Sequence, residues 1–293
     1  MNGPGLMVFA LVLRPPLGLD VYMPVTEANP LTRAKIVLGR KLFFDKRLSR
    51  DETLACASCH DPKLAFSDGR KVARGIGGQE GNRSAPAIVN RGYGRTFFWD
   101  GRAKSLEQQA LEPILNPKEL GMTVPEVERR TGLKIGEVTG ALASFVRTIR
   151  SGDSKFDRYI AGKPRALTEI EKAGLAVFRG TARCDNCHAG PNFTNEGFHN
   201  TGVAFRDGTL LDTGAGEGKF KVPTLREVAR TAPYMHDGSL ATLEDVVDFY
   251  NRGGNKNPGL DKDLRPLHLT SNEKRVLVAF LNSLSGRVIE GEP

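Results

Sequence analysis

All four cysteines of this 293-residue chain lie in two copies of one motif, Cys-x-x-Cys-His. The first copy contains Cys56, Cys59 and His60, and the second contains Cys184, Cys187 and His188. This spacing is typical of c-type haem attachment, because each thiol can add across one vinyl group of the porphyrin and the adjacent imidazole can bind the iron. The sequence therefore predicts two covalently bound c-type haems, around which the chain must fold.

A Cys-x-x-Cys pair has two interpretations other than haem attachment. Such a pair alone could be a redox dithiol or half of a zinc site. A zinc site would use the four thiolates but would leave His60 and His188 unexplained. The chain has only five histidines, so a histidine directly after both pairs favours haem.

The predicted haems also indicate where the protein is located. Bacteria attach c-type haem outside the cytoplasmic membrane, so we expect an exported, periplasmic protein. The apolar run Leu6–Leu13 is too short to span a bilayer, and residues 1–18 are interpreted as a signal or leader remnant. No later segment approaches membrane-spanning length, so stable membrane insertion is not expected.

Charge composition separates the candidate partners. The formal charge of +8 comes from 42 basic and 34 acidic residues, which are spread along the chain. No basic cluster with interleaved aromatic residues is present, which argues against nucleic acid binding. A positive surface would favour the approach of an acidic redox partner.

The two motifs follow similar stretches of sequence. Residues 31–44 place apolar side chains at helical spacing before the first motif, and Thr168 with Glu171 forms a capping box that opens a helix before the second. Further helices are expected at 106–115, 135–149, 243–250 and 270–284. The sequence predicts an all-α protein with long loops, in which two cytochrome c-like haem domains, 19–160 and 161–293, are related by duplication.

Several separate segments then identify a family. They are Phe-Ser-Asp-Gly at 66–69, Gly-Gly-Gln-Glu-Gly at 77–81, the runs 97–110 and 116–119, and Pro-Tyr-Met-His-Asp-Gly-Ser at 233–239. With them the chain resembles the bacterial dihaem cytochrome c peroxidase superfamily over nearly its whole length after Pro24. The resemblance implies hydrogen peroxide as substrate, a redox partner protein, a peroxidatic N-terminal domain and an electron-transfer C-terminal domain.

The resemblance also assigns three catalytic candidates. Trp99 matches the tryptophan that relays electrons between the haems, although as a lone tryptophan it could be a buried core residue. Gln109 and Glu119 match the pair above the first haem. A carboxylate beside peroxide can move a proton between its oxygens, and an amide can orient it. Without the resemblance, Glu119 would be interpreted as a surface acid.

The chain departs from ordinary peroxidases of the family at two ligand positions. Ile76 stands where they carry a histidine that caps the resting first haem, so we expect this haem to be five-coordinate. Tyr250 stands where they carry a methionine ligand of the second haem, and it resembles the MauG and MbnH branch. A phenolate stabilises oxidised iron. The alternative is that Tyr250 merely packs nearby and that Met235 or His236 is the ligand.

The resemblance further implies a calcium ion between the haems, held near Ser84, Thr231 and Pro233. Ser84 replaces the asparagine of the family, and its hydroxyl is a weaker oxygen donor, which weakens the case for calcium. His199 and His268 match no site in the family, and surface or structural roles are expected for them.

The favoured hypothesis is a periplasmic dihaem oxidoreductase that reacts with peroxide at the N-terminal haem. If Tyr250 is a ligand, MauG-like oxidation of a Trp or Tyr in a partner protein is favoured. One alternative is a peroxidase that takes electrons from a small cytochrome or cupredoxin. The other is a non-enzymatic dihaem electron carrier, which requires two filled axial positions on each iron.

Overall fold

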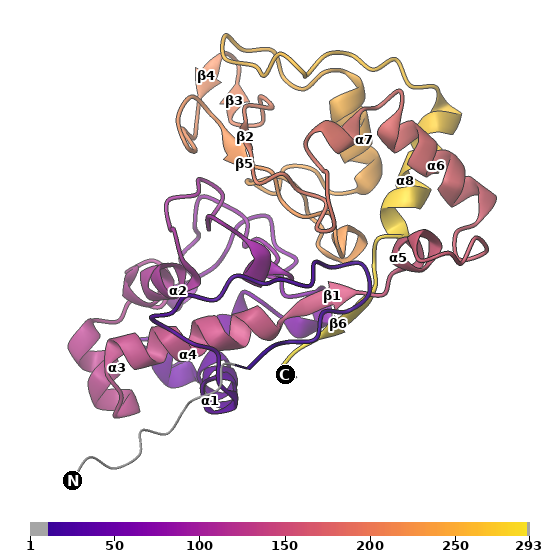
Figure 1. Cartoon of the computed structure of the whole chain (residues 1–293). Helices are drawn as coiled ribbons and strands as arrows, with labels where there is room; N and C mark the ends of the chain where they lie inside the picture. The colour runs from indigo at the N-terminus through magenta and orange to yellow at the C-terminus, as the bar shows by residue number, and fades with distance from the viewer. Residues whose placement is uncertain (1–10, 292–293) are drawn as a thin grey trace.

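The computed structural model describes residues 11–291, in which helices are joined by long loops (Figure 1). The helices are α1 (Arg33–Phe43), α2 (Leu106–Leu115), α3 (Val124–Thr131), α4 (Ile135–Thr148), α5 (Lys155–Ile160), α6 (Glu169–Arg179), α7 (Leu243–Asn251) and α8 (Ser271–Asn282). The strands are β1 (Arg150–Gly152), β2 (Phe198–His199), β3 (Phe205–Arg206), β4 (Thr209–Leu210), β5 (Phe220–Lys221) and β6 (Arg287–Ile289). They form the antiparallel pairs β1–β6, β2–β5 and β3–β4. The fold is therefore helix-rich with few strands. Strands this short leave no alternating pattern in the sequence.

The capping box predicted before the second motif is confirmed. Thr168 Oγ1 accepts a hydrogen bond from the Glu171 N–H at 3.3 Å, and Glu171 Oε2 accepts one from the Thr168 N–H at 2.7 Å. The same exchange at Thr270 and Glu273 opens α8. Each box satisfies two N–H groups that the first helical turn leaves without partners, so local sequence fixes these helix starts.

One packing arrangement occurs twice. Helix α1 crosses α4 at Gly39, where a Cβ atom would collide with the Ala141 carbonyl oxygen. Helix α6 crosses α8 at Gly174, where a Cβ atom would collide with the Val276 carbonyl oxygen. A glycine is therefore required at each crossing so that the two backbones can approach.

Aromatic contacts repeat the arrangement one turn further along each helix. The rings of Phe43 and Phe145 lie 5.1 Å apart at 59°, and those of Phe178 and Phe280 also lie 5.1 Å apart at 59°. Each Cys-x-x-Cys-His motif thus lies in the chain between the two helices of one such pair.

The apolar core is divided between these helix pairs. One cluster of buried side chains runs from Leu42 to Ile149, and a second runs from Phe156 to Leu284. We call residues 11–152 the first half and residues 153–286 the second half. The expected domain limit at residue 160 differs from this division, because Ser154 caps α5 and Phe156 then packs against rings of the second cluster.

Both ends of the described part of the chain contact the first half. Strand β6 pairs with β1, so the C-terminal segment returns from the second half to the first (Figure 1). At this junction the buried carboxylate of Glu227 accepts hydrogen bonds from Ser151 Oγ and the Gly286 N–H, both at 2.6 Å. Residues 1–10 of the expected leader lie outside the described residues. Residues 11–18 do contact the fold, since Leu13 is buried against α1.

Candidate functional site

Both Cys-x-x-Cys-His motifs adopt the same short turn. Residues Cys56–Ser58 and Cys184–Asn186 each form a 3₁₀ turn. The N–H of His60 donates to the Cys56 carbonyl at 3.0 Å, and the N–H of His188 donates to the Cys184 carbonyl at 2.9 Å. The turn thereby brings each histidine back towards the first cysteine of its motif.

The two histidine rings are held in the same way. Nδ1 of His60 lies 3.1 Å from the Phe66 carbonyl oxygen, and Nδ1 of His188 lies 3.0 Å from that of Phe193. A carbonyl only accepts, so each Nδ1 carries the proton and each Nε2 keeps a free lone pair. Burial lowers the pKa of His60 and takes that of His188 to about 4, so both rings are neutral at pH 7. A neutral ring with a free Nε2 fits an iron ligand.

The environment of the cysteines argues against a reactive dithiol or a zinc site. Burial raises the pKa of the Cys56 and Cys184 thiols to about 12, whereas redox-active cysteines have lowered values. Within residues 11–291, no three His, Cys, Asp or Glu side chains are grouped so that they could hold a metal ion directly.

One cavity of about 1220 Å³ joins the two motifs. A pocket for one small ligand usually measures about 300–1,000 Å³. The cavity wall includes all six cysteines and histidines of the motifs and side chains from both halves, among them Trp99, Gln109, Glu119 and Tyr250. Its size and its two sets of thiols and imidazoles fit two covalently attached haems.

Gln109 and Glu119 lie on the same wall as His60. Gln109 is on α2, which begins where Ser105 Oγ accepts from the Gln108 N–H, and Glu119 is in the loop that follows this helix. Asn116 Nδ2 donates to Glu119 Oε1 at 2.8 Å, which fixes the carboxylate. Burial raises the pKa of Glu119, although the Asn116 hydrogen bond opposes this. A raised pKa suits a carboxyl group that both accepts and returns a proton.

Ile76 does not line the cavity. Its side chain is buried and packs over Gly121. A Cβ atom added to Gly121 would lie only 2.6 Å from Ile76 Cδ1. Its backbone N–H donates to the Glu119 carbonyl at 2.9 Å. The loop that carries Ile76, in place of the capping histidine of ordinary peroxidases, is therefore bound to the segment that carries Glu119. The five-coordinate first haem stays a prediction.

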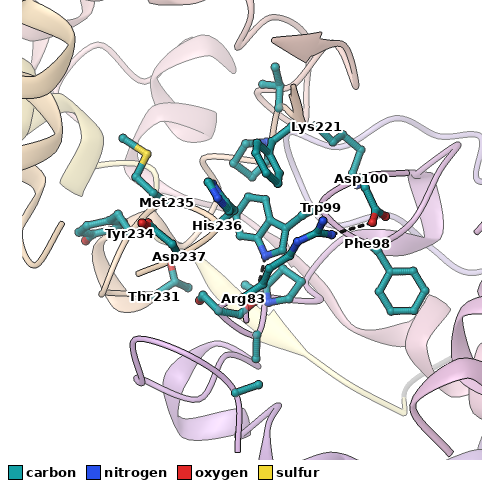
Figure 2. Close-up of a pocket in the computed structure, with 18 of the residues that line it drawn as sticks. Arg83, Phe98, Trp99, Asp100, Lys221, Thr231, Tyr234, Met235, His236 and Asp237 are labelled. Carbon is teal, nitrogen blue, oxygen red and sulfur yellow. Dashed lines mark hydrogen bonds and ion pairs between the residues drawn. The ribbon is translucent and has the colours of Figure 1, made fainter. Parts of the chain in front are cut away.

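Trp99 lies where the halves meet (Figure 2). Its Nε1–H donates to the Ser84 carbonyl at 2.9 Å, and the Ser84 N–H in turn donates to the His236 carbonyl at 2.7 Å. The Trp99 carbonyl accepts from the Lys221 N–H at 2.8 Å. Trp99 is half-buried at the cavity wall, and its indole is bound to the first half and its carbonyl to the second, unlike an ordinary core aromatic.

Tyr250 belongs to the second attachment site. It lies near the end of α7 and lines the cavity. Burial raises the pKa of its phenol above the usual range, and the neighbouring Cys184 and Cys187 raise it further. Such a phenol keeps its proton unless a strong cation, such as a ferric ion, binds the oxygen and displaces that proton.

The alternative ligands, Met235 and His236, also line the cavity (Figure 2). The His236 ring is stacked on Phe220, with centroids 3.6 Å apart and planes at 11°. It lies close to Trp99 at the junction, and burial lowers its pKa. This placement suits a packing role beside Trp99.

The residues expected to bind calcium come together only in part. Ser84, Thr231 and Pro233 all line the cavity. They supply no carboxylate, the Ser84 carbonyl already accepts from Trp99, and calcium takes six to eight oxygen ligands. By themselves these three residues do not make a calcium site, so the calcium ion stays a prediction.

Several charged residues of the site were not predicted from the sequence. The Arg83 side chain pairs with Asp100 at 2.7 Å in its own half and with Asp212 at 2.7 Å in the other (Figure 2). Arg91 pairs across the halves with Glu196 at 2.6 Å. These partners are far apart in the chain, and no local pattern connects them.

The two unassigned histidines differ in their surroundings. His268 is exposed. His199 lies at the cavity wall, where its Nδ1 is 2.6 Å from Asp261 Oδ2 and its Nε2 is 3.7 Å from Cys187 Sγ. Only the three-dimensional contact with Cys187 associates His199 with the site.

Comparison with known proteins identifies relatives across most of the chain. Residues 33–165 match the family model of the di-haem cytochrome c peroxidases. The methylamine utilization protein MauG of Methylorubrum extorquens is 40% identical over 288 residues, which cover 89% of this chain and 81% of that protein. The cytochrome c551 peroxidase of Nitrosomonas europaea is 33% identical, with 91% of this chain and 84% of that protein covered.

Solved structures agree with these relatives. A MauG-like protein associated with microbial copper homeostasis is 34% identical and superimposes with a TM-score of 0.83, covering 93% of each chain. The diheme peroxidase BthA of Burkholderia thailandensis is 25% identical with a TM-score of 0.73, covering 88% of this chain and 87% of that one. This chain belongs to the di-haem cytochrome c peroxidase family, in its MauG-like branch, and is a dihaem oxidoreductase of the peroxidase type.

Proposed function

We propose that this protein reacts with hydrogen peroxide at the haem attached beside His60 and withdraws electrons from a Trp or Tyr side chain of a partner protein. The two haem domains, which we infer to be related by duplication, have different tasks in this proposal. The repeated helix crossings at Gly39 and Gly174 support the duplication. The placement of Tyr250 beside Cys184 and Cys187 is the observation that carries the functional assignment.

In the first half, the protein supplies proton handling. Haem, when bound through Cys56 and Cys59, supplies an iron that binds peroxide and stores oxidising equivalents. The Glu119 carboxylate accepts a proton at one peroxide oxygen and returns it to the other, while the Asn116 amide holds that carboxylate in place. The Gln109 amide orients the peroxide.

In the second half, the protein holds an oxidised site and connects it to the first. His188, with Nδ1 bound to the Phe193 carbonyl, would hold the haem iron through Nε2, and we assign the Tyr250 oxygen as a further ligand of that iron. An anionic oxygen donor favours the oxidised state of iron. Trp99, with hydrogen bonds to both halves, lies on the route by which electrons pass between the sites.

A periplasmic location is part of the proposal, because bacteria attach c-type haem outside the cytoplasmic membrane. Over residues 11–291, every helix is too short or too polar to cross a bilayer. The partner is either a protein substrate or, in the ordinary peroxidases, an electron-donating cytochrome or cupredoxin.

One experiment separates these two partners. One equivalent of hydrogen peroxide is added to the fully oxidised holoprotein, and visible and near-infrared spectra are recorded over time. We expect a long-lived near-infrared band that disappears when a protein with an oxidisable Trp or Tyr is added, with the oxidised residue identified by mass spectrometry. Rapid turnover that requires a reduced cytochrome, without such a band, would contradict the proposal.

A further inference from the structure

Lys221 is a buried lysine at the junction of the two halves. It lies on β5, and its backbone N–H donates to the Trp99 carbonyl at 2.8 Å (Figure 2). Its side chain is 9% exposed and forms part of the cavity wall. A lysine that is buried this far ordinarily has an anionic partner.

The described residues give the Lys221 ammonium little compensation. Its Nζ donates to the Thr96 carbonyl at 3.1 Å, and the nearest carboxylate, Glu196, lies 3.9 Å away. That carboxylate is already engaged by both terminal nitrogens of Arg91, at 2.6 and 3.1 Å, and by the Arg95 N–H. An ammonium has three N–H donors, and here one is well used.

The local charges do not balance. Arg91 and Lys221 are two buried cations that share the single carboxylate of Glu196. Burial lowers the pKa of Lys221 to about 7, and the nearby Arg91 adds to this effect. Two other cations of the cavity wall differ, because Arg226 is paired with Asp157 at 2.7 Å and Arg83 with two aspartates. One further negative charge at the junction would therefore balance the two cations.

We propose that Lys221 binds a propionate carboxylate of a haem held in the cavity. Every haem has two such carboxylates, and when buried they require cationic or hydrogen-bonding partners. The same residue then connects that carboxylate to the backbone of Trp99. The inference rests on the proposed placement of both haems, but it does not depend on the identity of the electron donor.

The test is a spectroelectrochemical titration of both haems in purified holoprotein. In Lys221→Met, removal of a positive charge beside the carboxylate favours oxidised iron. We expect the reduction equilibrium of at least one haem to shift towards the oxidised form by about tenfold, which is 59 mV for a one-electron couple. Lys221→Arg keeps the charge and should keep both potentials close to those of the wild type.

Lys219→Met is the matched control. Lys219 is 42% exposed, pairs with Glu217 and does not line the cavity, so its loss should leave both potentials unchanged.

Unchanged potentials in a folded Lys221→Met protein would overturn the inference. If that variant does not fold, resonance Raman spectra of wild type and Lys221→Arg decide the question, because the propionate bending modes should differ between an ammonium and a guanidinium partner. Identical modes would also overturn it. Neither measurement requires peroxide or a protein substrate, so failure of the proposed function would be seen separately.

Discussion

The two halves of this protein hold their attachment motifs in nearly the same way but face them with different residues. In each half a glycine-mediated helix crossing, a phenylalanine pair and a histidine bound through Nδ1 to a phenylalanine carbonyl are repeated. On the cavity wall, Glu119 and Gln109 belong to the first half, whereas Tyr250 belongs to the second. In the proposed function, attachment would thus be a local property of each motif, and reactivity would be set by side chains that lie far from it in sequence.

Among the substitutions that test this difference between the halves, removal of the Glu119 carboxylate should have the largest effect on the measured rate. In Glu119→Gln the first half would lose its proton acceptor, and we expect the reaction with hydrogen peroxide to slow by about 10²–10⁴-fold. Stopped-flow absorbance of the oxidised holoprotein measures the rate. Glu112→Gln is the control, because the Glu112 side chain pairs with Arg102 but does not itself line the cavity, so its loss should change the rate far less. Equal rates in wild type and Glu119→Gln would remove the distinction between the halves.

Replacement of Tyr250 tests the second half. In Tyr250→Phe we expect a changed low-spin signal in the paramagnetic resonance spectrum of the resting protein. Oxidation of a partner protein should fall by at least about tenfold, while the first reaction with peroxide persists. Tyr234→Phe is the control, since Tyr234 also lines the cavity but donates to the Val228 carbonyl. An unchanged low-spin signal in Tyr250→Phe would refute ligation by tyrosine.

The smallest expected effect comes from removing the hydrogen bond that Asn116 donates to Glu119. The Asn116 hydrogen bond stabilises the charged carboxylate and lowers its pKa, so Asn116→Ala should raise that pKa. The charged form is the proton acceptor, and it would then appear only at higher pH. We expect the midpoint of the pH–rate profile for the peroxide reaction to move upward by about one unit or less. A midpoint that moves downward would mean that Glu119 is not the group that titrates.

Local sequence predicted much of the fold. The capping box at Thr168 places a helix start correctly because both partners lie within one helical turn. The 3₁₀ turns of the two motifs were not predicted, although they too are made of local backbone hydrogen bonds. The two-residue strands and the start of α5 were not predicted, since they depend on contacts made only after the halves have packed.

The distal residues are an intermediate case. Trp99, Gln109, Glu119 and Tyr250 were identified through the resemblance, and all four line one cavity. Their proposed roles are predictions. Arg83, Lys221 and His199 were not identified, because their partners Asp212, Trp99 and Cys187 belong to other segments of the chain. Charge balance at a junction becomes visible only when the junction is assembled.

The pairing of β6 with β1 has a consequence for biogenesis. Strand β6 follows both Cys-x-x-Cys-His motifs in the chain, and its partner β1 lies more than a hundred residues before it. Contacts between segments this far apart form late in folding. In the proposed function, haem would therefore be attached to a chain that is still open at this edge, and the pairing of β1 with β6 would close the edge afterwards.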